Sequence, residues 1–351
     1  MSILVTGSSG GIGGNVVRML LEAGEEVVGF DVAPPGPGSV AADVADHFPL
    51  VLGSVTDLAC LMRATQHHGV EGIIHMAAML FLGLEWRTHE MVRVNIEGTV
   101  NVLEATRLLG LPKMVFTSSY SAAGLHPDLS RPVPEDGGSH LPLHTIYATT
   151  KLAAEGICHR YREDLGMDVR IVRPASVYGP GLYRPDFGRP VDSILNELLE
   201  GRDVQVAHGS DTLLDYTYVM DEARGIIQAY EAESTQSWIF NISFGQHRTL
   251  GQIVEVMRRE FPDRTIDVGL GSWNGLDGKG SASLLRPPSD SSLAREELGY
   301  DPQYDIDRAI PAYVRWLRNR ENVSVVAGAG GIASQLAIAI RPCCCWSLRS
   351  S

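Results

Sequence analysis

The sequence predicts an α/β protein with a doubly wound parallel sheet and a smaller, looser lobe near the C-terminus. Short apolar runs of strand length alternate with helical patterns through the first half of the 351-residue chain. This alternation is typical of a parallel sheet that is covered by helices on both faces. Hydrophobic residues make up 44% of the chain, which is enough to bury a large core.

A change of hydrophobic period predicts the first strand and helix. Residues 2–6 form an apolar run that ends in a glycine-rich turn, and apolar residues then recur at helical spacing over residues 12–21. Gly24 follows this helix, as a C-terminal cap would. A second apolar strand is expected at residues 26–31, and it ends in Asp31.

The glycine-rich turn is suited to binding a diphosphate. Glycines let the backbone approach phosphate oxygens closely, and the N-terminal amides of the helix that follows attract negative charge. We therefore expect a Rossmann-type dinucleotide site here, although glycine turns before helices also occur without a ligand. The residues assigned to it are Gly7, Gly10, Gly11, Ile12 and Gly13.

Asp31 lies about 20 residues beyond this turn, where a carboxylate can accept hydrogen bonds from the ribose hydroxyls of an adenosine. No Arg or Lys occurs between Asp31 and Asp57 to neutralise a 2′-phosphate, which Asp31 would repel. The sequence therefore favours NAD over NADP. The alternative is an aspartate that ends the strand by chance.

The later elements continue the alternation and then become shorter. Further strands are expected at residues 51–52, 72–76, 114–117 and 169–172, and helices at residues 58–64, 91–109 and 146–165. Beyond Gly181 prolines and glycines are frequent, and short helices are expected near residues 194–199, 291–298 and 306–320.

This change in composition and helix length beyond Gly181 predicts where the chain divides into two domains and a tail. We expect residues 1–181 to form an NAD-binding domain, to which residues 215–243 return. Residues 182–214 and 244–321 would form a smaller substrate-binding lobe, and residues 322–351 a disordered tail rich in Gly, Ala and Ser.

Charge and targeting signals narrow the possible partners and location. The formal net charge of -13 argues against nucleic acid or an anionic membrane as the main partner. The sequence begins without a signal-peptide pattern, so we expect a cytoplasmic protein. The five cysteines show neither a disulfide framework nor zinc spacing. We expect no metal site at His126, His140 and His144, because Pro142 breaks any helical ligand spacing.

Three side chains are candidates for chemistry. Tyr147 and Lys151 stand four residues apart and share one face of a helix. A nearby ammonium stabilises a phenolate, which would lower the pKa of Tyr147 from about 10 and make it a general acid or base. Ser119 follows a strand at its carboxyl end, where open α/β sheets bind ligands. Each pattern taken alone also occurs on ordinary helices and turns.

These motifs, in this order, resemble the extended short-chain dehydrogenase/reductases, also called the NAD-dependent epimerase/dehydratase family, over most of residues 1–320. The matching segments are the glycine turn, His-Met-Ala-Ala at 75–78, Asn-Ile-Glu-Gly-Thr at 95–99, the Tyr147–Lys151 pair, and residues 173–180. The resemblance implies hydride transfer at a secondary alcohol or ketone, with Tyr147 as acid–base and Ser119 beside the substrate oxygen. Lys151 would tune Tyr147 and anchor the nicotinamide ribose.

The resemblance also implies further contacts. It places Ser54 and Val55 near the adenine, with Asp57 as a substitute for an aspartate that relatives often carry at position 54. It implies a homodimer through helices 90–109 and 147–165. Because His75 lies at a strand end, we expect it to be a packed core histidine rather than a catalytic one. The other positions that the resemblance assigns to the cofactor site are Ala77, Asn95 and Pro174.

Two departures from the family pattern bear on the substrate. Leu214 stands where nucleotide-sugar enzymes usually carry an Arg that clamps the diphosphate, and Ser176 stands where they carry Asn. These losses favour a small polyol, sugar acid or other hydroxy compound, because a buried diphosphate needs a cationic partner. The apolar residues 79–84 are expected to pack in the core rather than line a pocket.

Two other functions stay open. The first is a nucleotide-sugar epimerase or dehydratase with tightly bound NAD, in which lobe arginines replace the missing one. The candidates for that replacement are Arg184, Arg189, Arg248 and Arg286. The second is an NAD(H)-sensing binding protein, although relatives of that kind generally lose the Tyr–Lys pair, which is present here.

Overall fold

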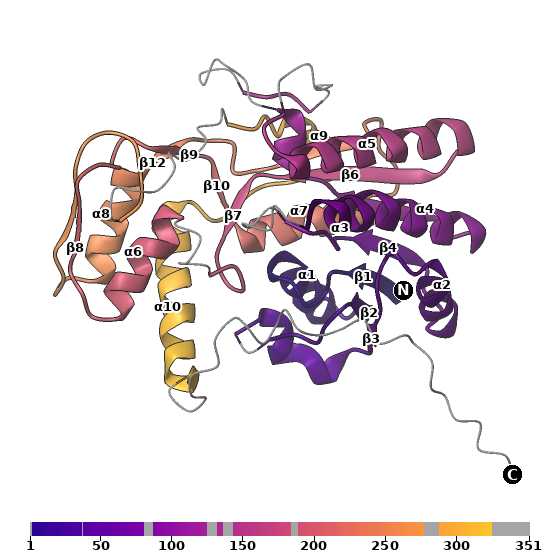
Figure 1. Ribbon diagram of the computed structural model, residues 1–351, viewed down its shortest axis with the longest axis horizontal. Coiled ribbons are helices and arrows are strands. Elements are labelled where there is room, and N and C mark those ends of the chain that lie inside the picture. The colour runs from indigo at the N-terminus through magenta and orange to yellow at the C-terminus, as the bar shows by residue number, and fades with distance from the viewer. Residues whose placement is uncertain are drawn as a thin grey trace, which may run out of the picture.

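A parallel sheet lies at the centre of the fold (Figure 1). The computed structural model describes residues 2–36, 38–80, 87–124, 132–135, 143–183, 189–276 and 288–324, and in this part of the chain seven strands pair in the order β11-β6-β5-β4-β1-β2-β3. All of these pairs are parallel. The strands are β1 (Ser2–Thr6), β2 (Glu26–Asp31), β3 (Leu50–Leu52), β4 (Gly72–His75), β5 (Lys113–Thr117), β6 (Asp168–Pro174) and β11 (Ile239–Ile242).

Helices cover both faces of this sheet, so its central strands are buried and mostly apolar. Every residue of β1 is buried. One face packs against α1 (Gly11–Glu22), α7 (Val219–Glu231) and α9 (Ser292–Leu298). The other packs against α2 (Leu58–His67), α4 (Gly98–Leu108) and α5 (Ile146–Leu165). This arrangement confirms the doubly wound, Rossmann-type sheet that the sequence predicts.

The strand order reverses beside β1. The chain runs from β1 outward to β2 and β3, and then crosses to the other side of β1 to form β4, β5 and β6. In open α/β sheets the carboxyl ends of the strands at such a reversal form the ligand crevice. The glycine turn follows β1 directly, so it lies at this position.

The long helix expected at residues 91–109 contains an irregular turn. The helical run consists of α3 (Thr88–Val92), a π-helical turn η3 (Arg93–Glu97) and α4. Single π turns inside helices are often found at functional sites. Hydrophobic spacing does not reveal such a turn, because the apolar residues on either side keep helical periodicity.

A second group of elements packs around its own core. Buried side chains of α6 (Pro190–Leu199), α8 (Leu250–Glu260) and α10 (Ile306–Ser324) meet in one cluster, on the left in Figure 1. Short strand pairs complete this part: β8 (Val204–Val206) with β13 (Ile266–Val268), and β9 (Leu213–Leu214) with β12 (Arg248–Thr249). Between the two cores, β7 (Ser176–Tyr178) pairs with β10 (Tyr216–Tyr218).

Several segments begin or end beyond their expected bounds. A proline at its first position starts α6 at Pro190, where its fixed φ suits a helix start. Helix α10 continues to Ser324, so residues 322–324 of the expected tail are helical, and residues 325–351 lie outside the described part. No helix in the part of the chain that the structure describes is long and apolar enough to cross a membrane.

Candidate functional site

The glycine turn is packed so closely that side chains would not fit. Gly7 has φ +73°, and a Cβ added to it would lie 2.8 Å from the backbone nitrogen of Ala77. A Cβ on Gly13 would lie 2.1 Å from the carbonyl oxygen of Gly7. Gly10 is the N-cap residue of α1 and brings no side-chain cap. The N-terminal amides of α1 are therefore suited to an anionic ligand, as a dinucleotide diphosphate requires.

The two residues after Gly10, Gly11 and Ile12, pack against other parts of the protein. A Cβ on Gly11 would lie 2.4 Å from Cδ2 of Leu182, so Gly11 allows the loop after β7 to approach α1. Asn15 strengthens this contact by donating to the carbonyl oxygen of Pro180 at 2.9 Å. Ile12 packs against the sheet core beneath α1.

Asp31 joins the end of β2 to the glycine turn. Its Oδ2 accepts from the backbone nitrogen of Ser9 at 3.0 Å, and its Oδ1 accepts from that of Val32 at 2.7 Å. Burial raises the pKa of this carboxyl, and the backbone hydrogen bonds oppose that rise. A carboxylate has about four lone-pair sites, so acceptor capacity remains for a ribose hydroxyl beside the turn.

We expect Asp31→Ala to lower the preference for NAD over NADP by about tenfold or more, because the variant loses both a ribose acceptor and the charge that repels a 2′-phosphate. The measurement is the ratio of dissociation constants for the two dinucleotides. Asp46→Ala, which removes an exposed carboxylate elsewhere, is the control. An unchanged ratio in Asp31→Ala contradicts the role assigned to Asp31.

The residues expected near the adenine follow β3. The Ser54 hydroxyl bonds to the Thr56 hydroxyl at 2.8 Å, and Val55 is buried against the first turn of α4. Asp57 caps α2, because its Oδ1 accepts from the backbone nitrogen of Cys60 at 2.9 Å. The cap occupies one carboxylate oxygen, so the adenine contact expected of Asp57 stays a prediction.

Asn95 connects the strand end at β4 with α5. It lies in the π turn, and its Oδ1 accepts from the backbone nitrogen of Met79 at 2.8 Å. Its Nδ2 donates to the carbonyl oxygen of Met79 and to the Thr150 hydroxyl, each at 3.0 Å. Because Thr150 precedes Lys151, this buried amide positions the first turns of α5 against the strand ends.

His75 is a buried core histidine, as the sequence predicts. Its Nδ1 lies 2.7 Å from the Thr6 hydroxyl, and its Nε2 lies 3.1 Å from the Thr99 hydroxyl. The Thr99 hydroxyl donates to the carbonyl oxygen of Asn95, so it must accept from Nε2, which fixes the tautomer of the neutral ring. Burial, together with the charge of Lys151, lowers the pKa of His75 to about 3.

This lowered pKa predicts acid destabilisation. An unfolded histidine binds a proton below about pH 6.5 and the folded one does not. The stability contributed by neutral His75 is therefore complete above that pH and is lost as the pH falls toward 3.

We expect His75→Gln to remove up to about 1.4 kcal/mol per pH unit from the acid dependence of the unfolding free energy. Urea titrations at pH 7 and pH 5 measure how the unfolding free energy changes with pH. His67→Gln, a substitution of an exposed histidine, is the control. Equal acid dependence in wild type and His75→Gln contradicts the assignment.

The three candidate catalytic side chains lie where β5 and α5 meet. Ser119 follows β5, and its hydroxyl accepts from the backbone nitrogen of Ser121 at 3.1 Å. Tyr147 lies in the first turn of α5, which Thr145 caps by accepting from the backbone nitrogen of Ala148. Lys151 follows one turn later and is buried. The described contacts thus place Lys151 and Tyr147 on the helix that packs beside the end of β5.

Lys151 reaches back to the strand. Its Nζ donates to the carbonyl oxygen of Thr117 at 2.8 Å, and it lies 6.0 Å from the centre of the Tyr147 ring. Burial lowers the pKa of Lys151 to about 8, and the negative charge of Glu155 opposes this fall. The ammonium therefore predominates at pH 7, where it can favour a phenolate on Tyr147.

A buried ion pair beneath these residues was not predicted from the sequence. Glu155 accepts from Arg173 through both carboxylate oxygens and also from the Ser118 hydroxyl. Glu155 lies four residues beyond Lys151, and that spacing was the signal available in the sequence. Pro174, at the end of β6, follows Arg173 and lies opposite Ile242 of β11.

The arginines considered as replacements for one at position 214 have different surroundings. Arg189 donates to the carbonyl oxygen of Val177 in β7, and its guanidinium lies 5.9 Å from the centre of the Tyr216 ring in β10. Leu214 itself is buried in the lobe core. Arg184 and Arg286 lie outside the described residues, as do residues 81–84, His126, His140 and Pro142.

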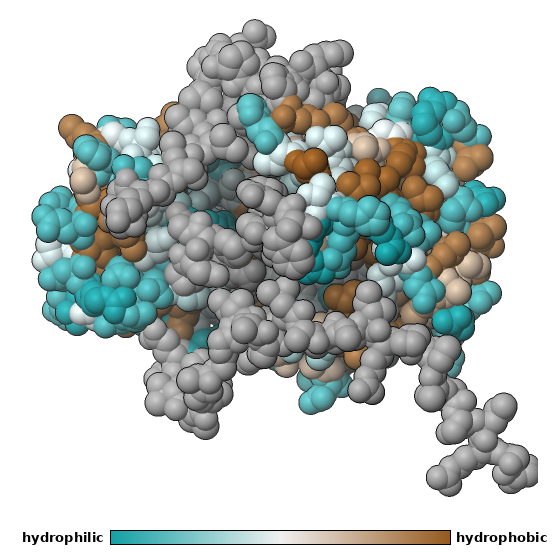
Figure 2. Space-filling view, viewed as in Figure 1, coloured by the Kyte–Doolittle hydropathy of each residue, from teal (hydrophilic) through white to brown (hydrophobic). Residues whose placement is uncertain are grey.

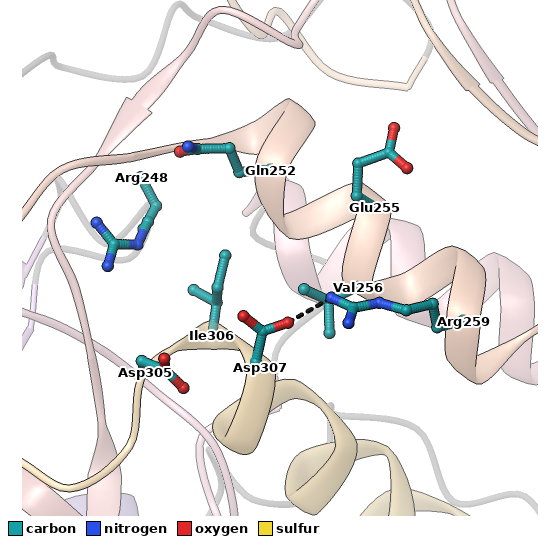
Figure 3. A pocket seen from close by; sticks show the side chains of 8 residues that line it. All are labelled: Arg248, Gln252, Glu255, Val256, Arg259, Asp305, Ile306 and Asp307. Carbon is teal, nitrogen blue, oxygen red and sulfur yellow. Dashed lines mark hydrogen bonds and ion pairs between the residues drawn. The ribbon is translucent and has the colours of Figure 1, made fainter.

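Arg248 lines a different surface. Figure 3 shows it at one end of a groove of about 380 Å³ between α8 and the start of α10. In this groove Arg259 pairs with Asp307, and none of the lining residues belongs to the predicted cofactor site. Among the described residues, no cluster of three or more His, Cys, Asp and Glu side chains is suited to a metal ion.

Comparisons with known proteins agree with this geometry. Residues 3–243 match the family model described as the NAD dependent epimerase/dehydratase family. The chain is 32% identical to a UDP-glucose 4-epimerase of Mycolicibacterium smegmatis over 329 residues, which cover 91% of this chain and 99% of the relative. It is 27% identical to a UDP-glucuronate 4-epimerase of Thermodesulfobacterium geofontis, with 92% and 97% covered.

A solved structure extends the comparison to three dimensions. The UDP-glucose 4-epimerase of Thermotoga maritima, crystallised with UDP-glucose, superimposes with a TM-score of 0.76 at 25% identity, and the match covers 91% of this chain and 99% of that one. The glycine turn, the Asp31 carboxylate and the Tyr147–Lys151 helix lie at the sheet edge where a dinucleotide would bind. The chain belongs to the NAD-dependent epimerase/dehydratase family, and its cofactor is NAD.

Proposed function

We propose that this protein is a nucleotide-sugar 4-epimerase that keeps its NAD bound through each catalytic cycle. The observation that carries the proposal is the similarity to two sugar-nucleotide 4-epimerases over 91% and 92% of the chain. That similarity includes the smaller lobe as well as the sheet. It favours a nucleotide sugar over the small hydroxy compound that the loss of an arginine at position 214 suggested.

The site residues have complementary roles in this reaction. The glycine turn and Asp31 would hold the cofactor. Tyr147 would take the proton from the C4 hydroxyl and return it after the sugar has turned, while Ser119 donates a hydrogen bond to the same oxygen. The positive charge of Lys151 would stabilise the phenolate of Tyr147. Bound NAD would supply reversible acceptance of the C4 hydride, with return to the opposite face of the sugar.

The residues after Ser119 favour epimerisation over dehydration. Loss of water from a sugar requires a further acid and base beside the oxidised carbon. Residues 120–124 contain no Asp or Glu. The carboxylate of Glu135 is already held by three backbone amides, those of Asn241, Leu293 and Ala294. An epimerase needs only one acid–base side chain at this position, and Tyr147 supplies it.

Arg189 is the cation that we assign to the substrate diphosphate. It lies between β7 and β10, the two strands that join the sheet to the lobe, and it keeps 28% of its side chain exposed. Oδ2 of Asp192 lies 3.9 Å from its Nε. A partly exposed guanidinium at this junction can donate paired hydrogen bonds to a diphosphate. We assign residues 182–214 and 244–321 to binding of the nucleotide part.

We also propose that the protein is a homodimer that associates through α3, α4 and α5. Figure 2 shows hydrophobic side chains gathered over the region of α4 and α5. The exposed large hydrophobic residues of these helices include Val92, Leu108, Ile146 and Leu165. Light scattering should give twice the chain mass of 38.1 kDa. A mass of one chain at micromolar concentration contradicts the proposal.

The test of the function is incubation of gel-filtered protein with UDP-glucose or UDP-glucuronate and no added NAD. We expect proton NMR to show the 4-epimer of at least one substrate. Absence of either epimer, together with reduction of added NAD⁺ by a simple alcohol, would favour a net dehydrogenase. NADH binding without turnover of any substrate would favour an NAD(H)-sensing protein.

A further inference from the structure

Three elements of the site meet at one buried carboxylate. Glu155 of α5 is 3% exposed, and Arg173 of β6 is 2% exposed. Oε1 of Glu155 accepts from the Ser118 hydroxyl at 2.5 Å and from Nε of Arg173 at 2.8 Å, and Oε2 accepts from Nη2 of Arg173 at 2.6 Å. The carboxylate therefore joins a helix, a strand and the residue that precedes Ser119.

An ion pair this deeply buried is weak evidence for stability. Removing two charges from water costs several kcal/mol per ion, and a well-packed apolar pair is often as stable. The geometry offers another reason for the pair: Glu155 lies one helical turn beyond Lys151 on the same face of α5. A negative charge at that position stabilises the ammonium of Lys151, against the burial that destabilises it.

The same carboxylate also fixes the hydrogen-bond acceptor of Lys151. The Lys151 ammonium donates to the carbonyl oxygen of Thr117 at 2.8 Å. Ser118, the next residue, is held by Glu155. Glu155 thus influences both partners of the Lys151–Thr117 hydrogen bond. Its charge stabilises the ammonium of Lys151, and its bond to Ser118 holds the residue next to Thr117. Ser119 follows immediately, so its position depends on the same contact.

The other titratable groups near Lys151 do not supply this charge. His75 of β4 is neutral because burial lowers its pKa to about 3. Cys158 of α5 is a thiol, because burial raises its pKa. Arg173 of β6 is a cation, and Tyr147 is the group that the ammonium acts on. Of the groups described here as facing Lys151, Glu155 is the carboxylate that balances it.

We propose that Glu155 is a positioning residue of the reaction, which keeps Lys151 charged and holds the Ser118–Ser119 turn through its buried contacts with Arg173 and Ser118. The inference rests on the proposed roles of Tyr147 and Lys151. It does not require the substrate to be a nucleotide sugar.

The test follows the ionisation of Tyr147 directly. Tyrosinate absorbance near 295 nm is recorded against pH for each protein, and the same titration with Tyr147→Phe added is subtracted. In Glu155→Gln we expect the Tyr147 midpoint to move upward by about one pH unit, since Lys151 loses its charge at lower pH. Glu163→Gln, an exposed carboxylate on the same helix, should leave the midpoint unchanged.

A double variant covers the case in which Glu155→Gln leaves Arg173 unpaired and does not fold. Glu155→Gln with Arg173→Gln removes both charges of the pair, which avoids a lone buried cation. A raised Tyr147 midpoint in either folded variant supports the proposal. A wild-type midpoint in a folded Glu155→Gln protein, or in the double variant when the single one does not fold, overturns it. Because no substrate is used, this result is independent of the epimerisation test.

Discussion

Tyr147→Phe should lower turnover by about 10³-fold or more while the protein still binds NAD. The variant loses only the phenolic oxygen, so the ring remains beside Lys151, whose Nζ lies 6.0 Å from the ring centre. Without that oxygen no described side chain takes the C4 proton in the proposed reaction. The measurement pairs initial rates of 4-epimer formation with the NAD content of gel-filtered protein.

Tyr161→Phe is the matched control for this substitution. Tyr161 lies on the same helix, and its hydroxyl donates to Glu104 at 2.7 Å. Its loss should cost about 1 kcal/mol of stability and leave the rate near that of wild type. Normal turnover in Tyr147→Phe would show that another group performs the proton transfer. Loss of NAD from that variant would show that Tyr147 acts mainly in cofactor binding.

Gly13→Ala should weaken NAD binding by more than about 100-fold, a loss of about 2.7 kcal/mol or more. The added methyl group would lie 2.1 Å from the carbonyl oxygen of Gly7 and 2.9 Å from its carbonyl carbon. Both are backbone atoms, so the turn that faces the diphosphate must change shape. Calorimetric titration of protein stripped of its bound NAD measures the effect, and thermal unfolding checks that the protein is folded.

Two other glycines calibrate this prediction. A Cβ on Gly10 would lie 3.2 Å from the same Gly7 oxygen, so Gly10→Ala should distort the turn less than Gly13→Ala. It should still weaken NAD binding, because its methyl group would stand where the backbone approaches the diphosphate. Gly156 of α5 has nothing within 4 Å of an added Cβ, and Gly156→Ala should stabilise the helix by about 1 kcal/mol without changing affinity. Wild-type affinity in a folded Gly13→Ala protein would contradict the placement of NAD at this turn.

Much of the sheet could be predicted from the sequence because local residue patterns indicate its strands and turns. Apolar runs of strand length, a glycine turn after residues 2–6 and Asp31 at the end of the next strand are all visible in the sequence. The π turn at Arg93–Glu97 could not be predicted in the same way. Asn95 lies in that turn and bonds to Met79 and Thr150, which are distant in sequence, so the irregularity accompanies tertiary contacts.

In the candidate site, too, local patterns could be predicted but contacts between residues distant in sequence could not. The spacing of Tyr147 and Lys151 is a local pattern, whereas the pair of Glu155 and Arg173 joins positions 18 residues apart and required the packing of α5 on β6. Asp57 caps α2, a role that its place before a helical pattern allowed in addition to the expected contact with the adenine.

The substrate was the least predictable feature. Leu214 in place of an arginine favoured a small hydroxy compound, because a sequence does not show which distant cation could take over that contact. Arg189 was one of four arginines considered as a replacement, and the structure distinguishes it by its place at the junction of β7 and β10. Similarity over the full length of sugar-nucleotide 4-epimerases then favours the nucleotide sugar.

In the proposed reaction a hydride leaves C4 of the sugar and returns to C4 within one binding event. The most direct measurement is incubation of gel-filtered protein with UDP-glucose that carries deuterium at C4, followed by NMR and mass spectrometry of the products. We predict a 4-epimer that retains the deuterium at C4, with no build-up of absorbance at 340 nm. A product without the label, or label released into free NADH, would contradict the account.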